Sequence, residues 1–297
     1  MKLFAPSYYN KFKCIADKCR HSCCVGWEID IDDTALCKYR ALTHPYASEV
    51  LKSIECGETP HFRLCEGERC PHLDENNLCR IILNLGEGFL CDICREHPRF
   101  YNQTKNGLEV GLGMACEEAC RLILTSDGYG EMLEIGEAEG REEADFDPRV
   151  LRERVYSLLS DRKTPYNQRL NAIYGEFAVS PSDISDNGWR ELLFSLEYLD
   201  NAHRELFSHY SSELFDCAEK EKTLERALAY FVYRHCTAAL CEDEFRAALG
   251  FCLFCERLLA SLLRNSGENA VTLARIISEE LEYSEDNTEA IVFEFST

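Results

Sequence analysis

Hydrophobic residues recur at helical spacing through the second half of the chain. Leu151, Val155, Leu158 and Leu159 follow one another at i, i+4, i+7 and i+8, which places them on one face of an α-helix. Similar stripes predict four further helices. The second helix, with Ser185 or Asp186 as a cap, contains Leu192, Leu193, Leu196, Leu199 and Leu206, and the third begins with Leu224, Leu228, Phe231 and Val232. The fourth contains Leu249, Leu253, Leu259, Leu262 and Leu263 and is ended by Asn265 and Gly267, and a fifth is expected over residues 272–281. Residues 149–297 are therefore expected to form a helical bundle that supplies the core.

The first half of the chain has a different pattern. Its apolar segments are short and are broken by Cys, Pro, Gly and Asn. Residues 126–148, SDGYGEMLEIGEAEGREEADFDP, combine glycines with a surplus of acids, which is typical of an exposed connection, and they hold a short predicted strand over 132–135. The sequence thus predicts a mainly α protein. An irregular, Cys-rich, metal-binding region over 1–125 is expected to pack on the helical domain over 149–297.

Length and charge narrow the range of functions. With 297 residues and 45% hydrophobic composition, the chain can bury a sizeable core without disulfides. The formal charge of -21 is unevenly spread, because most of the acidic surplus follows residue 120. The sequence has no basic stripe of the kind that neutralises phosphates, so nucleic acid is not expected as a partner.

The sequence also predicts the compartment. The opening residues, MKLFAPSYYNKFKC, lack the apolar stretch of a secretory signal, and no run approaches the ~18 apolar residues of a membrane helix. We therefore expect a cytoplasmic protein that does not engage a membrane. Thiols stay reduced in the cytosol, so structural disulfides are disfavoured.

Thirteen of the 18 cysteines lie within the first 120 residues, and their spacing predicts metal binding. The candidate ligands are Cys14, Cys19, Cys23, Cys24, Cys70, Cys79, Cys91, Cys94 and Cys116. Adjacent cysteines normally point apart, so either two centres share this region or one of Cys23 and Cys24 is structural. The presence of more than four candidate cysteine ligands favours an iron–sulfur cluster, which is held by cysteine thiolates. Zinc is the alternative, and His21, His72 or His97 could join such a site.

A second CxxC, formed by Cys252 and Cys255, lies inside an apolar helical stripe. A free cysteine behaves as a small hydrophobe and is among the most buried residue types. We therefore expect these two residues, together with Cys217, Cys236 and Cys241, to pack in the core.

Several blocks of the sequence resemble the flagellin lysine-N-methylase family. They are PSYYNKFKC; C-x3-CC-x-GW-x-ID-ID over 19–32; CPHLDENNLCRI over 70–81; LGEGFLCDICREHPRF over 85–100; GLGMACEEACRLIL over 111–124; and IISEELEYSEDN over 276–287. Three features depart from the family pattern: Ala115 stands where Ser is usual, Glu117 and Glu118 follow Cys116 without the usual Pro, and Tyr283 stands in place of His. The likeness extends over nearly the whole chain.

This resemblance implies an enzyme that transfers a methyl group from S-adenosylmethionine to lysines of flagellin before export, with cysteines that hold an iron–sulfur cluster of the 4Fe-4S type. The Gly-rich strand–turn–helix that ordinarily holds S-adenosylmethionine is missing from the sequence. A lysine with a reference pKa of ~10.4 must be desolvated and deprotonated before it attacks a sulfonium. The candidates for accepting the lysine proton are Tyr8, Tyr9, Asp30, Glu117 and Glu28. The rings of Tyr8, Tyr9, Phe100 and Tyr101 could also pack against the sulfonium or the ammonium group.

Two residues are candidates for binding the methyl donor. The indole face of Trp27 could flank its sulfonium, although a core position for this residue competes with that role. Arg99 could pair with its carboxylate, or with a structural partner. The alternative function is a noncatalytic, zinc-stapled module that binds a protein partner. Thiol–disulfide chemistry at Cys91 and Cys94 is disfavoured, because no thioredoxin-like βαβ pattern surrounds them.

Overall fold

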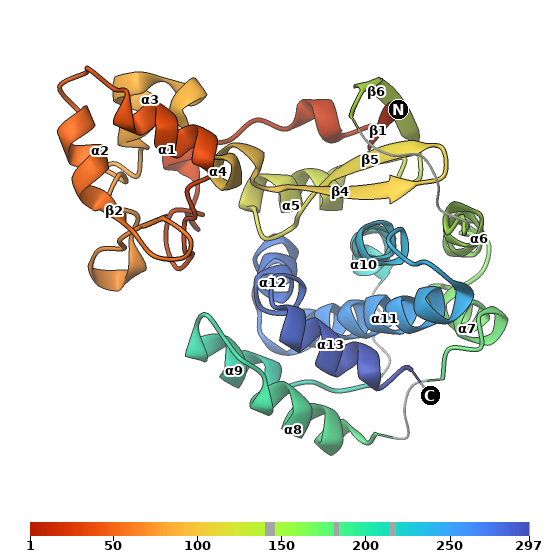
Figure 1. Ribbon diagram of the computed structural model, residues 1–297. Coiled ribbons are helices and arrows are strands. Elements are labelled where there is room, and N and C mark those ends of the chain that lie inside the picture. The colour runs from red at the N-terminus through yellow and green to blue at the C-terminus, as the bar shows by residue number, and fades with distance from the viewer. Residues whose placement is uncertain (140–145, 181–183, 214–217, 297) are drawn as a thin grey trace. The chain divides into compact units, whose positions relative to one another are not determined.

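The computed structural model describes residues 1–139, 146–180, 184–213 and 218–296. The chain divides into two compact units (Figure 1). The small unit is Lys13–Arg99, and the large unit combines Met1–Phe12 with Phe100–Thr297. The predicted boundaries at residues 125 and 148 both fall inside the large unit. Helices make up most of the regular structure, which confirms the predicted mainly α class.

A four-stranded sheet belongs to the large unit (Figure 1). Its order is β4-β5-β1-β6, with β1 at Lys2–Pro6, β4 at Arg99–Thr104, β5 at Gly107–Leu112 and β6 at Met132–Glu137. Strand β1 runs parallel to β5, with Leu3 opposite Leu108, and antiparallel to β6. The strand predicted over 132–135 is confirmed as part of β6. It is a member of the sheet, and not only part of a connection.

Each predicted stripe lies on helices of the large unit, although one stripe is divided between two helices and the first, third and last helices of this unit were not predicted. The helices of the large unit are α5 (Glu117–Thr125), α6 (Arg149–Leu159), α7 (Tyr166–Glu176), α8 (Asp186–Ser195), α9 (Asn201–Phe207), α10 (Ala218–Phe231), α11 (Glu242–Asn265), α12 (Ala270–Ile277) and α13 (Glu285–Phe293), with a 3-10 turn, η1 (Tyr9–Lys11), and two π-helical turns, η5 (Val232–Cys236) and η6 (Ser278–Glu282). The stripe from Leu192 to Leu206 is two helices. The chain leaves the helical conformation at Leu196, and Asp200 caps α9 by accepting a hydrogen bond from Ala202 N at 2.8 Å.

Helix α11 forms the centre of the core and is buried on nearly every side. The prediction that cysteines pack there is confirmed for Cys236, Cys252 and Cys255, each of which is fully buried. It is wrong for Cys241, which is exposed at the start of α11, where its sulfur accepts a hydrogen bond from the backbone N–H of Glu244. Cys217 lies outside the described residues.

The small unit has a core of its own, built from Ile29, Ile31, Tyr39, Val50 and Phe62 among others. Its elements are α1 (Asp33–Arg40), α2 (Ala47–Ser53), β2 (Ile54–Glu55), β3 (His61–Phe62), α3 (Arg80–Leu85) and α4 (Asp92–Glu96), with 3-10 turns η2 (Ala16–Lys18), η3 (Glu66–Glu68) and η4 (Glu87–Phe89). The helices are short, so long-range contacts rather than helix propensity hold this unit together.

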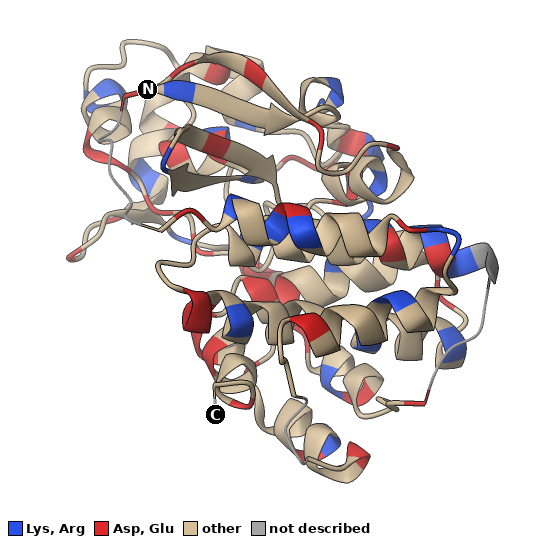
Figure 2. Ribbon diagram, turned by 90° about the vertical axis from the view of Figure 1, so that its right-hand side faces the viewer, with Lys and Arg blue, Asp and Glu red and all other residues tan. Residues whose placement is uncertain are grey.

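Charged residues of both signs are interspersed along the helices (Figure 2). None of the helices among the described residues combines the length and the apolar character that crossing a membrane requires.

Candidate functional site

Five of the cysteines predicted as metal ligands gather in the small unit. They are Cys24, Cys70, Cys79, Cys91 and Cys94. Cys70 and Cys91 are buried in the core of this unit, and the other three pack against it as partly buried residues. The Sγ atoms of Cys91 and Cys94 lie 3.5 Å apart. Thiols from three separate sequence blocks therefore meet in one place, which we call the thiol cluster.

A tight turn brings Cys70 and Cys79 together. Asp74 Oδ1 accepts hydrogen bonds from the backbone N–H groups of Asn76 and Leu78, each at 2.8 Å. This Asx turn is the local structure that an aspartate favours, and it reverses the chain between the two cysteines. The sequence DENN between them is therefore the local reason that both sulfurs reach one core.

Two members of the thiol cluster immediately precede a short helix. Cys79 is the N-cap residue of α3; burial raises the pKa of its thiol, and the backbone N–H groups of Ile81 and Ile82 only partly offset that rise. Cys91 is the N-cap residue of α4, and the N–H of Cys94 points at its sulfur. Backbone N–H groups at a helix start stabilise a thiolate, which is the form of cysteine that binds metal.

The thiols also oppose one another's ionisation. Burial raises the pKa of Cys70 to about 12, and the neighbouring sulfurs add to the rise. The hydrogen bond that links Cys94 to Cys91 and burial raise the pKa of Cys94 as well. Only a nearby cation would let several of these groups ionise together. The all-sulfur donor set fits an iron–sulfur cluster or zinc, both of which thiolates select.

The other four candidate ligands lie outside these five. Cys14 and Cys23 are exposed and Cys19 is half-buried, all three in the small unit. Cys23 gives a hydrogen bond to Cys24, which lowers the pKa of Cys24 to about 7. Cys116 is the N-cap residue of α5 and belongs to the large unit.

His72 is buried beside Cys70, but both of its ring nitrogens are occupied. Ser53 Oγ donates to Val50 O at 2.6 Å, so it accepts from His72 Nε2 at 2.9 Å. His72 Nδ1 is then the acceptor for the hydroxyl of Tyr46 at 2.7 Å. Burial lowers the pKa of His72 to about 4, which keeps the ring neutral. This histidine therefore has no nitrogen to offer a metal.

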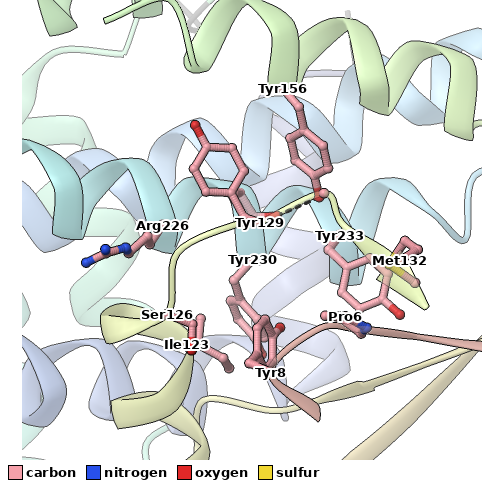
Figure 3. Close-up of a pocket in the computed structure, with 12 residues that line it drawn as sticks. Pro6, Tyr8, Ile123, Ser126, Tyr129, Met132, Tyr156, Arg226, Tyr230 and Tyr233 are labelled. Carbon is pink, nitrogen blue, oxygen red and sulfur yellow. Dashed lines mark hydrogen bonds between the residues drawn. The ribbon is translucent and has the colours of Figure 1, made fainter. Parts of the chain in front are cut away.

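A pocket in the large unit is lined by tyrosines (Figure 3). We call it the tyrosine pocket; its lining is Pro6, Tyr8, Ile123, Ser126, Tyr129, Gly130, Met132, Tyr156, Arg226, Ala229, Tyr230 and Tyr233. Its cavity of about 20 Å³ has room for one water-sized group. The space is far too small for S-adenosylmethionine. Of the predicted catalytic residues, Tyr8 lines this pocket.

The tyrosine pocket contains residues that the sequence analysis missed. Tyr129 precedes β6, Tyr156 lies on α6, and Tyr233 lies on the π-helical turn η5. The one available signal was the spacing of Tyr230 and Tyr233, which are three residues apart on a predicted helix and so share a face. Nothing in the sequence relates them to Tyr129 or Tyr156.

The remaining predicted catalytic residues occupy different places. Tyr9 begins η1 and Glu117 begins α5, and both are half-buried in the large unit. Asp30 is exposed in the small unit. Burial strongly raises the pKa of Tyr8, so its phenol stays protonated at neutral pH. Tyr8 can form hydrogen bonds, but it is not poised to act as a base.

The two predicted donor-binding residues lie in the small unit. Trp27 is half-buried. Arg99 is half-buried, and its Nη1 donates to the carbonyl of Arg95 at 3.2 Å. Neither residue lines the tyrosine pocket or a second, open cavity of about 460 Å³, which is lined by Lys38, Ala41, Leu42, Thr43, His44, Asn84, Leu85 and Phe89.

A buried polar network supports one wall of the tyrosine pocket. Tyr230 donates from its hydroxyl to Glu282 Oε2 at 3.1 Å, and His235 Nε2 lies 2.7 Å from Glu282 Oε1. Burial opposes ionisation of Glu282, but the charge of Arg234 and the hydrogen bond from His235 outweigh it and hold the pKa of Glu282 below its usual range. The network joins η5 to η6, so the two π-helical turns fix the position of Tyr230.

A group of possible cation ligands, His203, Glu279 and Glu280, has ligand atoms within 4.8 Å of one another. Glu280 is already saturated, because it accepts from His203 Nδ1 at 2.6 Å and from two backbone N–H groups. Glu279 pairs with Arg275. This arrangement ties α9 to η6 and serves the fold.

The fold and the thiol cluster thus define a mainly α protein with a cysteine-rich unit. The Flagellar biosynthetic protein FliU of Salmonella muenchen is 31% identical over 126 residues, which cover 40% of this chain and 75% of that protein. Lysine-N-methylases of Salmonella typhimurium and Salmonella choleraesuis are each 32% identical over 126 residues. The match spans 31% of the length of these lysine-N-methylases.

The chain belongs to the flagellin lysine-N-methylase family, as the resemblance of its sequence blocks predicts. No family model matches the sequence, and no solved structure matches the chain.

Proposed function

We propose that this protein methylates lysine side chains of flagellin in the cytoplasm, before flagellin is exported, with S-adenosylmethionine as the source of the methyl group. The observation that carries this proposal is the identity shared with proteins named Lysine-N-methylase and FliU. The match to FliU extends over three quarters of that protein.

The reaction sets clear demands on the site. The lysine Nζ lone pair forms a bond to the methyl carbon while the carbon–sulfur bond breaks and its electron pair stays on sulfur. A lysine with its ordinary pKa of ~10.4 is protonated at neutral pH, so the protein must favour the neutral amine and release one proton to solvent. Desolvation in an apolar environment achieves this.

We further propose that the thiol cluster holds an iron–sulfur cluster, with Cys70, Cys79, Cys91 and Cys94 as its ligands and Cys24 as a fifth candidate. Support comes from the all-sulfur donor set, the N–H groups that point at two of its sulfurs, and the hydroxyl partners that withdraw His72 from coordination. A cluster held by only three of these thiolates would leave one iron open to the amino and carboxylate groups of S-adenosylmethionine, whereas a cluster held by four would leave none.

The test is a methylation assay with protein purified without oxygen. Flagellin of the same organism is incubated with the protein, with and without S-adenosylmethionine, and digested for mass spectrometry. We expect lysine peptides heavier by one methyl group, only where both the protein and S-adenosylmethionine are present. A Salmonella lysine-N-methylase with its own flagellin serves as the positive control.

Unmodified flagellin from an assay in which the positive control succeeds would overturn the proposed activity. The iron proposal is tested separately by elemental analysis of the same preparation. A colourless protein that contains stoichiometric zinc and no iron would overturn the iron–sulfur proposal and identify the thiol cluster as a structural zinc site.

A further inference from the structure

The open cavity of the small unit, where α1, α3 and η4 meet, is large enough for a small molecule. Its volume of about 460 Å³ is within the range of roughly 300–1,000 Å³ that holds such a ligand. Leu42, Leu85 and Phe89 give it an apolar wall, and all three are half-buried. The turn η4, which ends at Phe89, contacts both α1 and α3, so the cavity is built within the small unit alone.

This cavity is positively charged, although the chain has a net charge of -21. Lys38 and His44 belong to its lining, and none of the described lining residues is acidic. Lys38 Nζ donates to the carbonyl of Gly88 at 3.0 Å, which positions the ammonium without neutralising it. Within the described ranges, no carboxylate forms an ion pair with Lys38. The cavity therefore offers a positive charge that an anion can bind.

The polar side chains of the lining also offer directed hydrogen bonds. The backbone N–H of Tyr46 donates to His44 Nδ1 at 3.1 Å, so the ring proton of His44 lies on Nε2, which can donate. Asn84 Nδ2 donates to the carbonyl of Arg80 at 2.8 Å, and its Oδ1 is left as an acceptor. An apolar wall with a few polar groups is the composition typical of a small-molecule site.

We propose that this cavity binds a small organic anion with an apolar ring. Lys38 and His44 hold its phosphate or carboxylate group, and the ring packs against Leu42, Leu85 and Phe89. S-adenosylmethionine fits the cavity poorly, because its sulfonium and amino groups are cationic and the lining offers them no carboxylate. The site is separate from the proposed methyl transfer, and its assignment does not depend on that reaction.

Phe89 connects the cavity with the thiol cluster. Its carbonyl accepts from the hydroxyl of Tyr39 at 2.7 Å, and Tyr39 is fully buried in the core of the small unit. Cys91 follows Phe89 by two residues. A ligand that packs against Phe89 therefore favours the conformation of η4 that places Cys91, and it should raise the thermal unfolding temperature of the protein.

The test is ligand-observed NMR on the full chain at low salt, where exposed charges are least screened. The probes are 1-naphthoate, 1-naphthyl phosphate and the neutral 1-naphthalenemethanol, which share one ring and differ in the attached group. We expect at least one of the two anions to bind about tenfold more tightly than the neutral probe, the effect of one charge-assisted hydrogen bond. The two anions distinguish a carboxylate ligand from a phosphate ligand.

Lys38→Met removes the charge and keeps the apolar stem, so it should weaken anion binding about tenfold and leave the neutral probe unaffected. The matched control is Lys52→Met, because Lys52 also lies in the last turn of a small-unit helix, α2, but does not line the cavity. It should bind as wild type does. Ala41→Phe fills the cavity, so it should weaken binding of both the anions and the neutral probe, and it should abolish the rise in unfolding temperature.

The absence of binding by either anion would overturn the assignment. Equal anion affinity in wild type, Lys38→Met and Ala41→Phe would also overturn it, as would an equal loss in Lys38→Met and Lys52→Met. Ala41→Phe keeps the test decisive if Lys38→Met does not fold. None of these measurements involves methyl transfer, so a failed flagellin assay would not affect their outcome.

Discussion

Arg152 and Glu109 form an ion pair in the core of the large unit, with Arg152 Nη1 2.6 Å and Nη2 3.0 Å from the two carboxylate oxygens. Both side chains are at most 4% exposed. The pair joins α6 to β5 and supports Tyr233 from behind. Its two-point geometry is the strong form of an arginine–carboxylate contact.

Breaking this pair from one side should be costly. Glu109→Gln leaves a buried guanidinium without a counter-charge, and we expect it to lower the free energy of unfolding by about 3–5 kcal/mol. Replacing both residues by leucine should cost less than the single change. Urea unfolding measures both values. As a control, Glu134→Gln removes an exposed ion pair with Lys2 and should leave the urea midpoint unchanged. Equal losses of unfolding free energy in Glu109→Gln and in the double leucine variant would contradict the expected cost of an unpaired buried charge.

Glu256 on α11 should make the protein less stable as the pH rises. Burial raises its pKa to about 7, while its hydrogen bond from Tyr166 at 2.9 Å and the nearby Arg257 only partly offset that rise. The folded state then binds a proton that the unfolded state has lost. Stability should fall between pH ~4.5 and pH ~7, by on the order of 3 kcal/mol, and level off above.

The measurement is urea unfolding at pH 5, 6, 7 and 8 for wild type and Glu256→Gln. The variant keeps an acceptor for Tyr166 and removes the ionisation, so its unfolding free energy should vary less over this range. A slope identical to that of wild type would show that other groups cause the pH dependence.

If the thiol cluster holds metal as proposed, Cys91→Ser should remove most of it. Cys91 is buried in the thiol cluster and receives a backbone N–H at its sulfur, whereas Cys37, in the same unit, is exposed. Elemental analysis of protein prepared without oxygen should show a large loss in Cys91→Ser and none in Cys37→Ser. Wild-type metal content in both variants would place the metal elsewhere.

His72→Gln should separate stability from metal binding. The substitution leaves the hydroxyls of Tyr46 and Ser53 without their ring partner, which we expect to cost about 1–3 kcal/mol for each group left unsatisfied. The metal content of the folded protein should match wild type, because both ring nitrogens are already engaged. A loss of metal in protein that is still folded would make His72 a ligand.

Gly130 and Gly128 offer a matched pair for the tyrosine pocket. Both have φ +85°, so alanine strains the backbone equally at either site, by about 1 kcal/mol. A Cβ at 130 would lie 2.8 Å from the ring of Tyr156, whereas a Cβ at 128 would first meet the flexible end of Glu131 at 3.2 Å. Gly130→Ala should therefore lose more stability than Gly128→Ala, as measured by urea unfolding. Equal losses of stability in the two variants would show that the ring of Tyr156 does not restrict the space at Gly130.

Local pattern determined much of the fold. The stripes through Leu151, Leu228 and Leu253 predicted α6, α10 and α11, because a 3.6-residue period leaves little freedom once one face must be buried. The failures have local causes. The stripe from Leu192 to Leu206 is interrupted by an extended turn that Asp200 caps, and β1 and β5 are short strands that depend on pairing with each other.

The sequence by itself marked its blocks as those of a methylase family and the cysteines as candidate metal ligands, since residue type and spacing carry that information. Tertiary structure decided which five thiols share a core, because Cys24, Cys70 and Cys91 belong to separate segments whose approach depends on packing. Tertiary structure also decided which residues line the tyrosine pocket. Tyr8 and Tyr233 are far apart in the chain, and whether their hydroxyls are satisfied depends on neighbours that no sequence period specifies.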